Sequence, residues 1–197
     1  MCTLLLVGRS RNGRSSVINS ILGQKMLFKT RVPSEVTRLT NEIHNNDEYV
    51  VVDGLGIGDK GAEMPGDIQE GLITRKFDNR PTLLHRCGFD ALIFVLKYSF
   101  RFTKQEKDAV QMVKSIFGEN VFRDWGILVF SYGDCYEYDY QESNKTFKDV
   151  CMKKRGDIKA LFEEVSYRCV LFNNKTKDRD KLEQQRRELS NNIQELK

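Results

Sequence analysis

The 197-residue sequence lacks the cysteine and histidine patterns of a disulfide-bonded or metal-binding domain. Its five cysteines are odd in number, and none forms a Cys-x-x-Cys pair. This argues against a disulfide framework and a structural zinc site, and it favours a reduced, intracellular compartment. His44 and His85 have no carboxylate or cysteine at ligand spacing, which argues against a catalytic histidine. A chain of this length can bury a hydrophobic core without disulfide bonds or a structural metal ion.

Long apolar runs and a strong charge of one sign are also missing. The best apolar run, residues 91–96, is far shorter than the roughly 20 residues of a membrane-spanning helix. The first residues lack the charged region and cleavage site of a signal peptide, and Cys2 stands where N-myristoylation requires glycine. A net charge of +4 permits contact with phosphates or acidic lipid. It is too small to indicate a nucleic-acid binder, so we expect no nucleic-acid partner.

What the sequence does contain is a series of short apolar runs that alternate with stretches of helical periodicity. Continuous apolar runs are typical of strands buried on both faces, as in a parallel sheet. Helix signals lie between them, such as the capping box formed by Thr103 and Glu106 and the stop at Gly118. This alternation predicts a three-layer α/β fold, a mostly parallel sheet flanked by helices. The runs are residues 4–7, 49–52, 91–96, 127–130 and 169–172.

The last 21 residues differ in character from the rest. Residues 177–197 are highly charged, and their apolar residues fall on one helical stripe, which predicts an amphipathic final helix. These residues are Leu182, Leu189, Ile193 and Leu196. We therefore expect a domain core over residues 1–176 and a C-terminal helix over residues 177–197 that belongs to the core or packs on it. Residues 132–148, rich in Asp, Glu, Tyr and Asn, are expected to form a surface loop that runs into a helix.

Residues 8–15 carry the most informative motif. They follow the first apolar run, precede a helical pattern, and have the Walker A spacing Gly-x-x-x-x-Gly-Lys-Ser, with Arg14 in place of the lysine. Glycines let the backbone turn so that successive N–H groups and a helix N-terminus hold phosphates, while the Ser15 hydroxyl would bind Mg²⁺. The alternative is a plain glycine turn. Arginine is larger than lysine, planar and forked, so Arg14 weakens the case for efficient hydrolysis more than the case for binding.

A second motif, residues 53–56, ends a buried run with the pattern Asp-x-x-Gly. Such an Asp53 holds Mg²⁺ through water, and the Gly56 N–H can sense a γ-phosphate; an ordinary strand end is the alternative. Thr37, between the two motifs, is a candidate Mg²⁺ ligand. Ile57 stands where a water-orienting glutamine would support Ras-type hydrolysis, so no catalytic residue is identified.

Base selection is predicted from residues near two later strand ends. The Asp134 carboxylate can accept hydrogen bonds from both N1–H and the 2-amino group of guanine, a pair that adenine lacks, and such a difference discriminates strongly. A simple turn residue is the alternative. Asn173 and Asn174, after the last apolar run, could close over the base with an amide or form a strand-ending turn.

Together these segments resemble the GTPases of immunity-associated proteins (the GIMAP family, also named after plant avirulence-induced genes), of the septin and Toc branch of Ras-like P-loop GTPases. The box over residues 91–103, which ends Phe-Arg-Phe-Thr, resembles one peculiar to this family. The other matching segments are residues 5–16, 19–23, 34–37, 51–56, 131–134 and 172–174.

The resemblance implies a Ras-like G domain that binds GTP or GDP with Mg²⁺ and hydrolyses GTP slowly. It also implies nucleotide-dependent homodimers through the G domains, a cytoplasmic location, and peripheral assembly at intracellular membranes. The implied metal ligands are Ser15, Thr37 and Asp53. The implied nucleotide-binding residues are Gly8, Arg9, Ser10, Arg11, Asn12, Gly13, Arg14, Ser15, Ser16, Thr37, Gly56, Tyr132, Gly133, Asp134, Asn173 and Asn174.

The chain departs from the family pattern at three places. Arg14 replaces the motif lysine, Gly54 replaces the usual threonine after Asp53, and Tyr132-Gly133 replaces a basic pair before the base-binding carboxylate. Arg14 keeps open a second function, a pseudo-GTPase scaffold with weak or no nucleotide turnover. A third, an ATP-using phosphotransferase, is disfavoured by Asp134.

Overall fold

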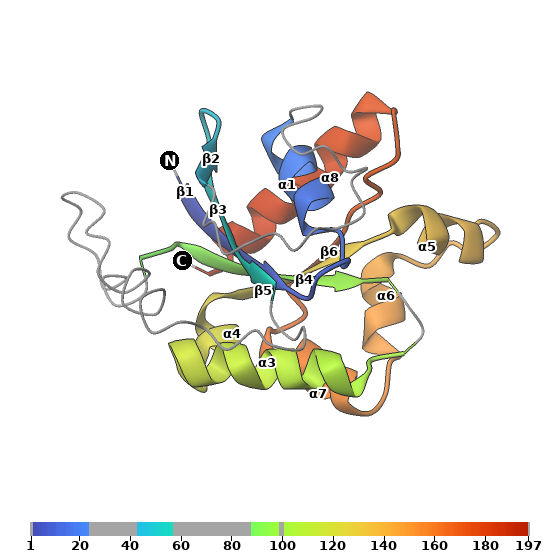
Figure 1. Cartoon of the computed structure of the whole chain (residues 1–197). Helices are drawn as coiled ribbons and strands as arrows, with labels where there is room; N and C mark the ends of the chain where they lie inside the picture. Colours follow the sequence, from blue (N-terminus) through green and yellow to red (C-terminus); the bar gives the residue numbers. More distant parts are fainter. Residues whose placement is uncertain (1, 24–42, 57–87, 99–100, 197) are drawn as a thin grey trace.

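The computed structural model describes residues 2–23, 43–56, 88–98 and 101–196, and these form an α/β fold around one sheet (Figure 1). The strand order is β2-β3-β1-β4-β5-β6; β2 runs antiparallel to β3, and the other neighbours are parallel. The predicted mostly parallel sheet is therefore confirmed. The strands are β1 (Cys2–Gly8), β2 (Ile43–Asn45), β3 (Tyr49–Gly56), β4 (Ala91–Lys97), β5 (Gly126–Ser131) and β6 (Cys169–Leu171).

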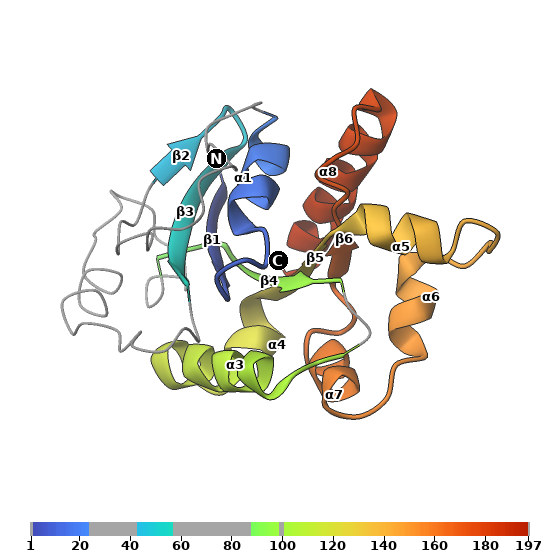
Figure 2. The same cartoon turned by 45° about the vertical axis from the view of Figure 1, so that its right-hand side comes forward.

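Helices cover both faces of the sheet, which gives the expected three layers. In Figures 1 and 2, α1 (Arg14–Leu22) and α8 (Arg179–Gln194) lie on one face. On the other face lie α3 (Lys104–Phe117), α4 (Val121–Trp125) and α7 (Asp157–Glu164). Two short helices, α5 (Gly133–Asp139) and α6 (Phe147–Met152), lie toward the β6 side of the molecule. Among the described residues, no helix combines the length and apolarity needed to cross a membrane.

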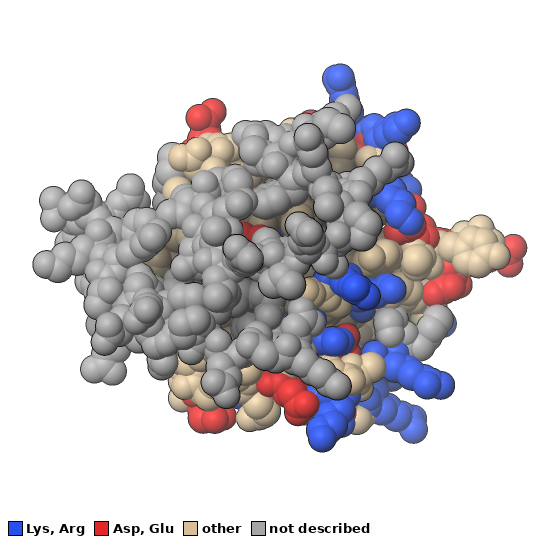
Figure 3. Space-filling view, in the orientation of Figure 1, with Lys and Arg blue, Asp and Glu red and all other residues tan. Residues whose placement is uncertain are grey.

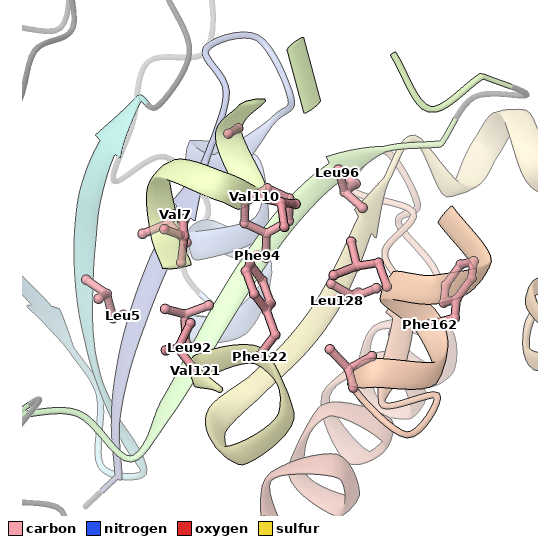
Figure 4. Close-up of a cluster of buried hydrophobic side chains, with 14 of the residues drawn as sticks. Leu5, Val7, Leu92, Phe94, Leu96, Val110, Val121, Phe122, Leu128 and Phe162 are labelled. Carbon is pink, nitrogen blue, oxygen red and sulfur yellow. The ribbon is translucent and has the colours of Figure 1, made fainter. Parts of the chain in front are cut away.

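The core explains why the strand sequences are apolar without interruption. Alternate side chains of one strand point to opposite faces, and both faces are covered here. In β1, Leu4 and Leu6 pack with α1 and α8, whereas Leu5 and Val7 pack with the α3 and α4 side. Figure 4 shows the second of these clusters, in which Phe94 of β4 meets the α4 and β5 side chains.

Local signals set the helix ends largely as predicted. The Thr103 N–H donates to Glu106 Oε2 at 2.7 Å, which completes the capping box at the start of α3. Gly118 ends that helix, and its N–H donates to the Lys114 carbonyl. Gly23 ends α1 in the left-handed conformation, with φ of 69°.

The C-terminal helix and residues 132–148 test two further expectations from the sequence. α8 begins after Asp178, whose carboxylate caps it, and buries Leu189 and Ile193 in the cluster that contains α1. The expectation of a surface loop that runs into a helix over residues 132–148 is wrong for residues 133–139, where α5 starts directly after β5, and holds for residues 140–146, which lead into α6. Tyr132 adopts φ of 62°, and this left-handed turn starts the helix at once. Tyr136 then packs edge-on against Tyr98 in a small buried cluster.

Candidate functional site

The predicted site residues gather at the carboxyl edge of the parallel strands. Gly8 pairs in register with Gly56, and farther across the sheet Lys97 pairs with Ser131. The segments that follow β1, β3, β5 and β6 therefore leave the sheet at one edge, where open α/β folds bind their ligands. Thr37 and Ile57 lie outside the described residues, so the predictions for them stay predictions.

The loop after β1, residues 8–13, is clamped against two neighbouring strands. Gly8 has φ of 150°, and a Cβ there would lie 2.5 Å from the Val95 carbonyl oxygen of β4. Gly13 has φ of 83°, and its Cβ would lie 3.2 Å from the side chain of Ser131. Asn12 is buried, and its side-chain amide donates to the Val95 carbonyl at 3.2 Å. The close backbone approach at Gly8 and the positive φ at Gly13 both favour glycine, so the two motif glycines fix the path of the loop.

The loop leads into the N-terminus of α1 in the form expected for an anion site. Gly13 is the N-cap residue and has no side chain to bond the first N–H groups, and the first turn contains no acidic residue. Unpaired N–H groups and the helix dipole therefore favour an anion here. Ser15 and Ser16 are half-buried in this first turn. Of the remaining loop residues, Arg9 is half-buried and Ser10 and Arg11 are exposed.

Arg14, in place of the motif lysine, is held by two groups of the protein. Its Nη1 donates to the Gly8 carbonyl at 2.7 Å, and its Nε lies 3.2 Å from Asp53 Oδ1. The Arg14 side chain is 13% exposed and that of Asp53 is 9% exposed, so this ion pair is mostly shielded from water. Asp53 sits in β3 beside Leu6 of β1. The arrangement places a permanent positive charge directly against the predicted metal-binding carboxylate.

The Arg14–Asp53 ion pair affects whether the implied ligands could bind Mg²⁺. Of the three implied ligands, Asp53 faces a guanidinium, Thr37 lies outside the described residues, and Ser15 supplies a single hydroxyl. Among the described residues, no group of three or more histidine, cysteine, aspartate or glutamate side chains could hold a metal ion. Mg²⁺ requires near-octahedral oxygen ligation with one or two carboxylates. As arranged, Asp53 is engaged by Arg14 and does not fit a Mg²⁺ ligand.

Asp134 lies in the first turn of α5, at the same edge of the sheet. Its Oδ2 accepts from Lys175 Nζ at 2.6 Å, and this hydrogen bond raises the pKa of Lys175. Its Oδ1 is buried and has no hydrogen-bond partner in the described part of the chain. A buried carboxylate oxygen without a donor is costly. Asp134 is therefore prepared to accept hydrogen bonds from a ligand.

Gly133 and the two asparagines join α5 to the end of β6. The Gly133 N–H donates to the Phe172 carbonyl at 3.0 Å, and a Cβ on Gly133 would lie 2.7 Å from the Asn173 nitrogen. Asn173 Oδ1 accepts from the N–H groups of Lys175 and Thr176, each at 3.1 Å. Asn174 Oδ1 accepts from the Ser20 hydroxyl. The Asn173 oxygen therefore serves the protein's own turn, which fits the strand-ending alternative, whereas the Asn174 oxygen joins this turn to α1.

Three residues outside the predicted set contribute to the site. Ser131 donates its hydroxyl to the Asn12 carbonyl at 2.6 Å and so joins the loop after β1 to the segment that carries Asp134. Lys97 Nζ lies 4.6 Å from the centre of the Tyr132 ring. Lys175 pairs with Asp134. Ser131 could have been found from its place three residues before Asp134 at a strand end, but no pattern pairs Lys175 with a residue 41 positions away.

A glycine-bounded loop between β1 and α1, at the carboxyl edge of a mainly parallel sheet, defines a P-loop G-domain fold. The chain belongs to the AIG1 family, whose model matches residues 2–197.

Similar curated proteins include three from Arabidopsis thaliana. Immune-associated nucleotide-binding protein 1 is 28% identical over 98% of this chain and 83% of its own length. Immune-associated nucleotide-binding proteins 12 and 10 are 33% and 31% identical over 88% and 94% of this chain. The chain spans only 42% and 39% of those two relatives.

Solved structures with the same fold include Toc33 from Arabidopsis thaliana. Its complex with GDP and Mg²⁺ superimposes with a TM-score of 0.62 at 17% identity, over 98% of this chain and 84% of Toc33. Its complex with Mg²⁺ and GMPPNP gives a TM-score of 0.57 at 15% identity, over 98% of this chain and 85% of Toc33. At this level of identity the comparison establishes the fold.

Proposed function

We propose that this protein binds guanine nucleotides at the carboxyl edge of its sheet, hydrolyses GTP slowly, and uses the bound nucleotide to control pairing of its G domains. The observation that carries the proposal is the buried Oδ1 of Asp134, which has no partner among the described residues. Guanine supplies the N1–H and 2-amino donors that a carboxylate requires, whereas the corresponding edge of adenine does not.

The phosphates would lie on the loop of residues 8–15. The uncapped N-terminus of α1 supplies N–H donors, and Arg14 supplies a positive charge beside Gly8. The Ser131 hydroxyl bonds to the Asn12 carbonyl, so the phosphate loop and the Asp134 segment are connected directly. This connection supports one ligand that contacts both. The remaining implied nucleotide-binding residues, Thr37 included, are proposed on the family resemblance.

Slow turnover is the part of the proposal that Arg14 affects most. Arg14 stands where the P-loop lysine contacts the β- and γ-phosphates, and it is engaged by Asp53 instead. Ile57 offers no group to orient water. The second candidate function, a pseudo-GTPase scaffold that holds nucleotide without turnover, is favoured by this Arg14–Asp53 pair. Hydrolysis of GTP by the purified protein above the rate of a protein-free control would exclude it.

A titration with fluorescently labelled GDP, GTP and ATP tests the proposal. We expect saturable binding of GDP and GTP, with ATP weaker by at least about 100-fold, because ATP cannot pair with the Asp134 carboxylate. Tighter binding of ATP than of GTP would indicate the phosphotransferase alternative. Failure of all three nucleotides to bind would contradict the proposed function itself.

Nucleotide-controlled pairing is tested by molecular mass. Among the structural neighbours, one mutant of Toc33 is deficient in dimerization, and dimerization is important for the GTPase activity of atToc33 and psToc159. For the present chain, we expect light scattering to report a monomer with GDP and a dimer with a non-hydrolysable GTP analogue. An identical mass in both states would contradict the pairing.

The surface visible in Figure 3 carries acidic side chains among its lysines and arginines, so the described part of this face is not uniformly positive. This agrees with the near balance of 32 basic and 28 acidic residues in the sequence. Contact with intracellular membranes and a cytoplasmic location are proposed on the family resemblance alone.

A further inference from the structure

The Arg14–Asp53 pair stands where a P-loop protein is expected to hold a divalent cation. The carboxylate that would face Mg²⁺ faces a guanidinium nitrogen at 3.2 Å, and the two side chains are 13% and 9% exposed. A guanidinium stays protonated throughout the physiological pH range. The position is therefore already occupied by positive charge before any metal ion arrives.

The contacts of Arg14 also determine which of its N–H groups remain available to a ligand. Nη1 donates to the Gly8 carbonyl at 2.7 Å, and Nε lies 3.2 Å from Asp53 Oδ1 in an ion pair that is not a hydrogen bond, so one atom is anchored and the other is held by charge. A guanidinium carries five N–H groups. In the described part of the chain, Nη2 has no hydrogen-bond partner. Nη2 is therefore available to a phosphate oxygen on the loop of residues 8–15.

A metal ion would have to displace this arrangement in order to use Asp53. Removing one member of a shielded ion pair leaves an uncompensated charge, which is strongly unfavourable. Mg²⁺ would also have to lose water, which it does reluctantly, to approach a carboxylate already neutralised by Arg14. A lysine at this position would carry a compact ammonium without the planar fork, and it could leave Asp53 for the phosphates.

We propose that Arg14 replaces Mg²⁺ as the cation that Asp53 holds against the bound nucleotide, so that guanine-nucleotide binding requires no divalent cation. This inference rests on the proposed function, because it concerns the same site.

The test compares the dissociation constant of labelled GDP in excess Mg²⁺ and in excess EDTA. For the unaltered protein, we expect the two values to agree within about twofold, since Arg14 already supplies the counter-charge. For Arg14→Lys, we expect EDTA to weaken binding by at least about tenfold, because Asp53 becomes available to Mg²⁺. Arg123→Lys is the matched control, as it makes the same change in an exposed arginine–aspartate pair on α4, outside the nucleotide site. It should keep the metal independence of the unaltered protein.

The outcomes separate this inference from the proposed function. Loss of GDP binding by the unaltered protein in EDTA, with binding restored by Mg²⁺, would overturn the inference and leave the proposed function standing. Failure of GDP and GTP to bind under either condition would overturn the proposed function and this inference with it. The comparison on the unaltered protein decides the matter even if Arg14→Lys does not fold.

Discussion

Replacing Asp134 by asparagine is expected to convert a guanine-nucleotide binder into a xanthine-nucleotide binder. A carboxylate accepts from both N1–H and the 2-amino group of guanine, whereas an asparagine side chain has one acceptor oxygen and one donor NH₂. The donor would face the 2-amino group, which cannot accept. Xanthine carries a carbonyl at that position, and the asparagine NH₂ can donate to it. We expect GTP affinity to fall by about 100-fold or more, and XTP to bind better than GTP.

Two further variants make this test specific. Asp134→Ala should lower GTP affinity to a similar degree and give no preference for XTP, because an alanine side chain has neither a donor nor an acceptor. Glu137→Gln removes a carboxylate from the same short helix, where Glu137 pairs with Lys181 at the surface. It should leave GTP affinity unchanged, since surface pairs contribute little. Circular dichroism checks that each variant folds. Normal GTP binding by Asp134→Asn would mean that the base does not meet this carboxylate.

The fold was accessible from sequence because its strands are buried on both faces. When helices cover both sides of a strand, every position is apolar, and runs such as 91–96 in β4 are visible without a structure. Parallel topology then brings the strand-end motifs to one edge, which is why Gly8 and Gly56 meet in register. α5 was missed because its start depends on Tyr132 adopting a left-handed conformation, which no hydrophobic period encodes.

The candidate site was predictable as a set of positions but not as a set of contacts. Arg14 was recognised as a departure from the motif, yet its partner lies 39 positions away in β3. The pairing of Asp134 with Lys175 also spans separate elements. Such pairs depend on where the loops place their side chains, and a periodic pattern reports burial rather than pairing. This is why the sequence indicates Mg²⁺ at Asp53 and the structure places a guanidinium there.

The last prediction concerns the backbone approach that fixes the phosphate loop. In Gly8→Ala, the new Cβ would lie 2.5 Å from the carbonyl oxygen of Val95 and 3.3 Å from its nitrogen, both in the backbone of β4. Neither atom can move without separating β1 from β4, which pair directly. The residue also has φ of 150°, which L side chains rarely adopt. We expect the free energy of unfolding to fall by about 2–4 kcal/mol, and GTP affinity to fall because the loop shifts.

Gly118→Ala is the matched control, because it has φ of 102° and no atom within 4 Å of the added Cβ. Its free energy of unfolding should fall only by the conformational cost, about 1–3 kcal/mol, and it should bind GTP normally. Urea denaturation followed by the fluorescence of Trp125, the one tryptophan in the chain, measures both variants. If the two substitutions cost the same, backbone strain alone accounts for Gly8. A larger loss of stability at Gly8, together with lost nucleotide binding, would show that glycine is required there because the loop lies so close to β4.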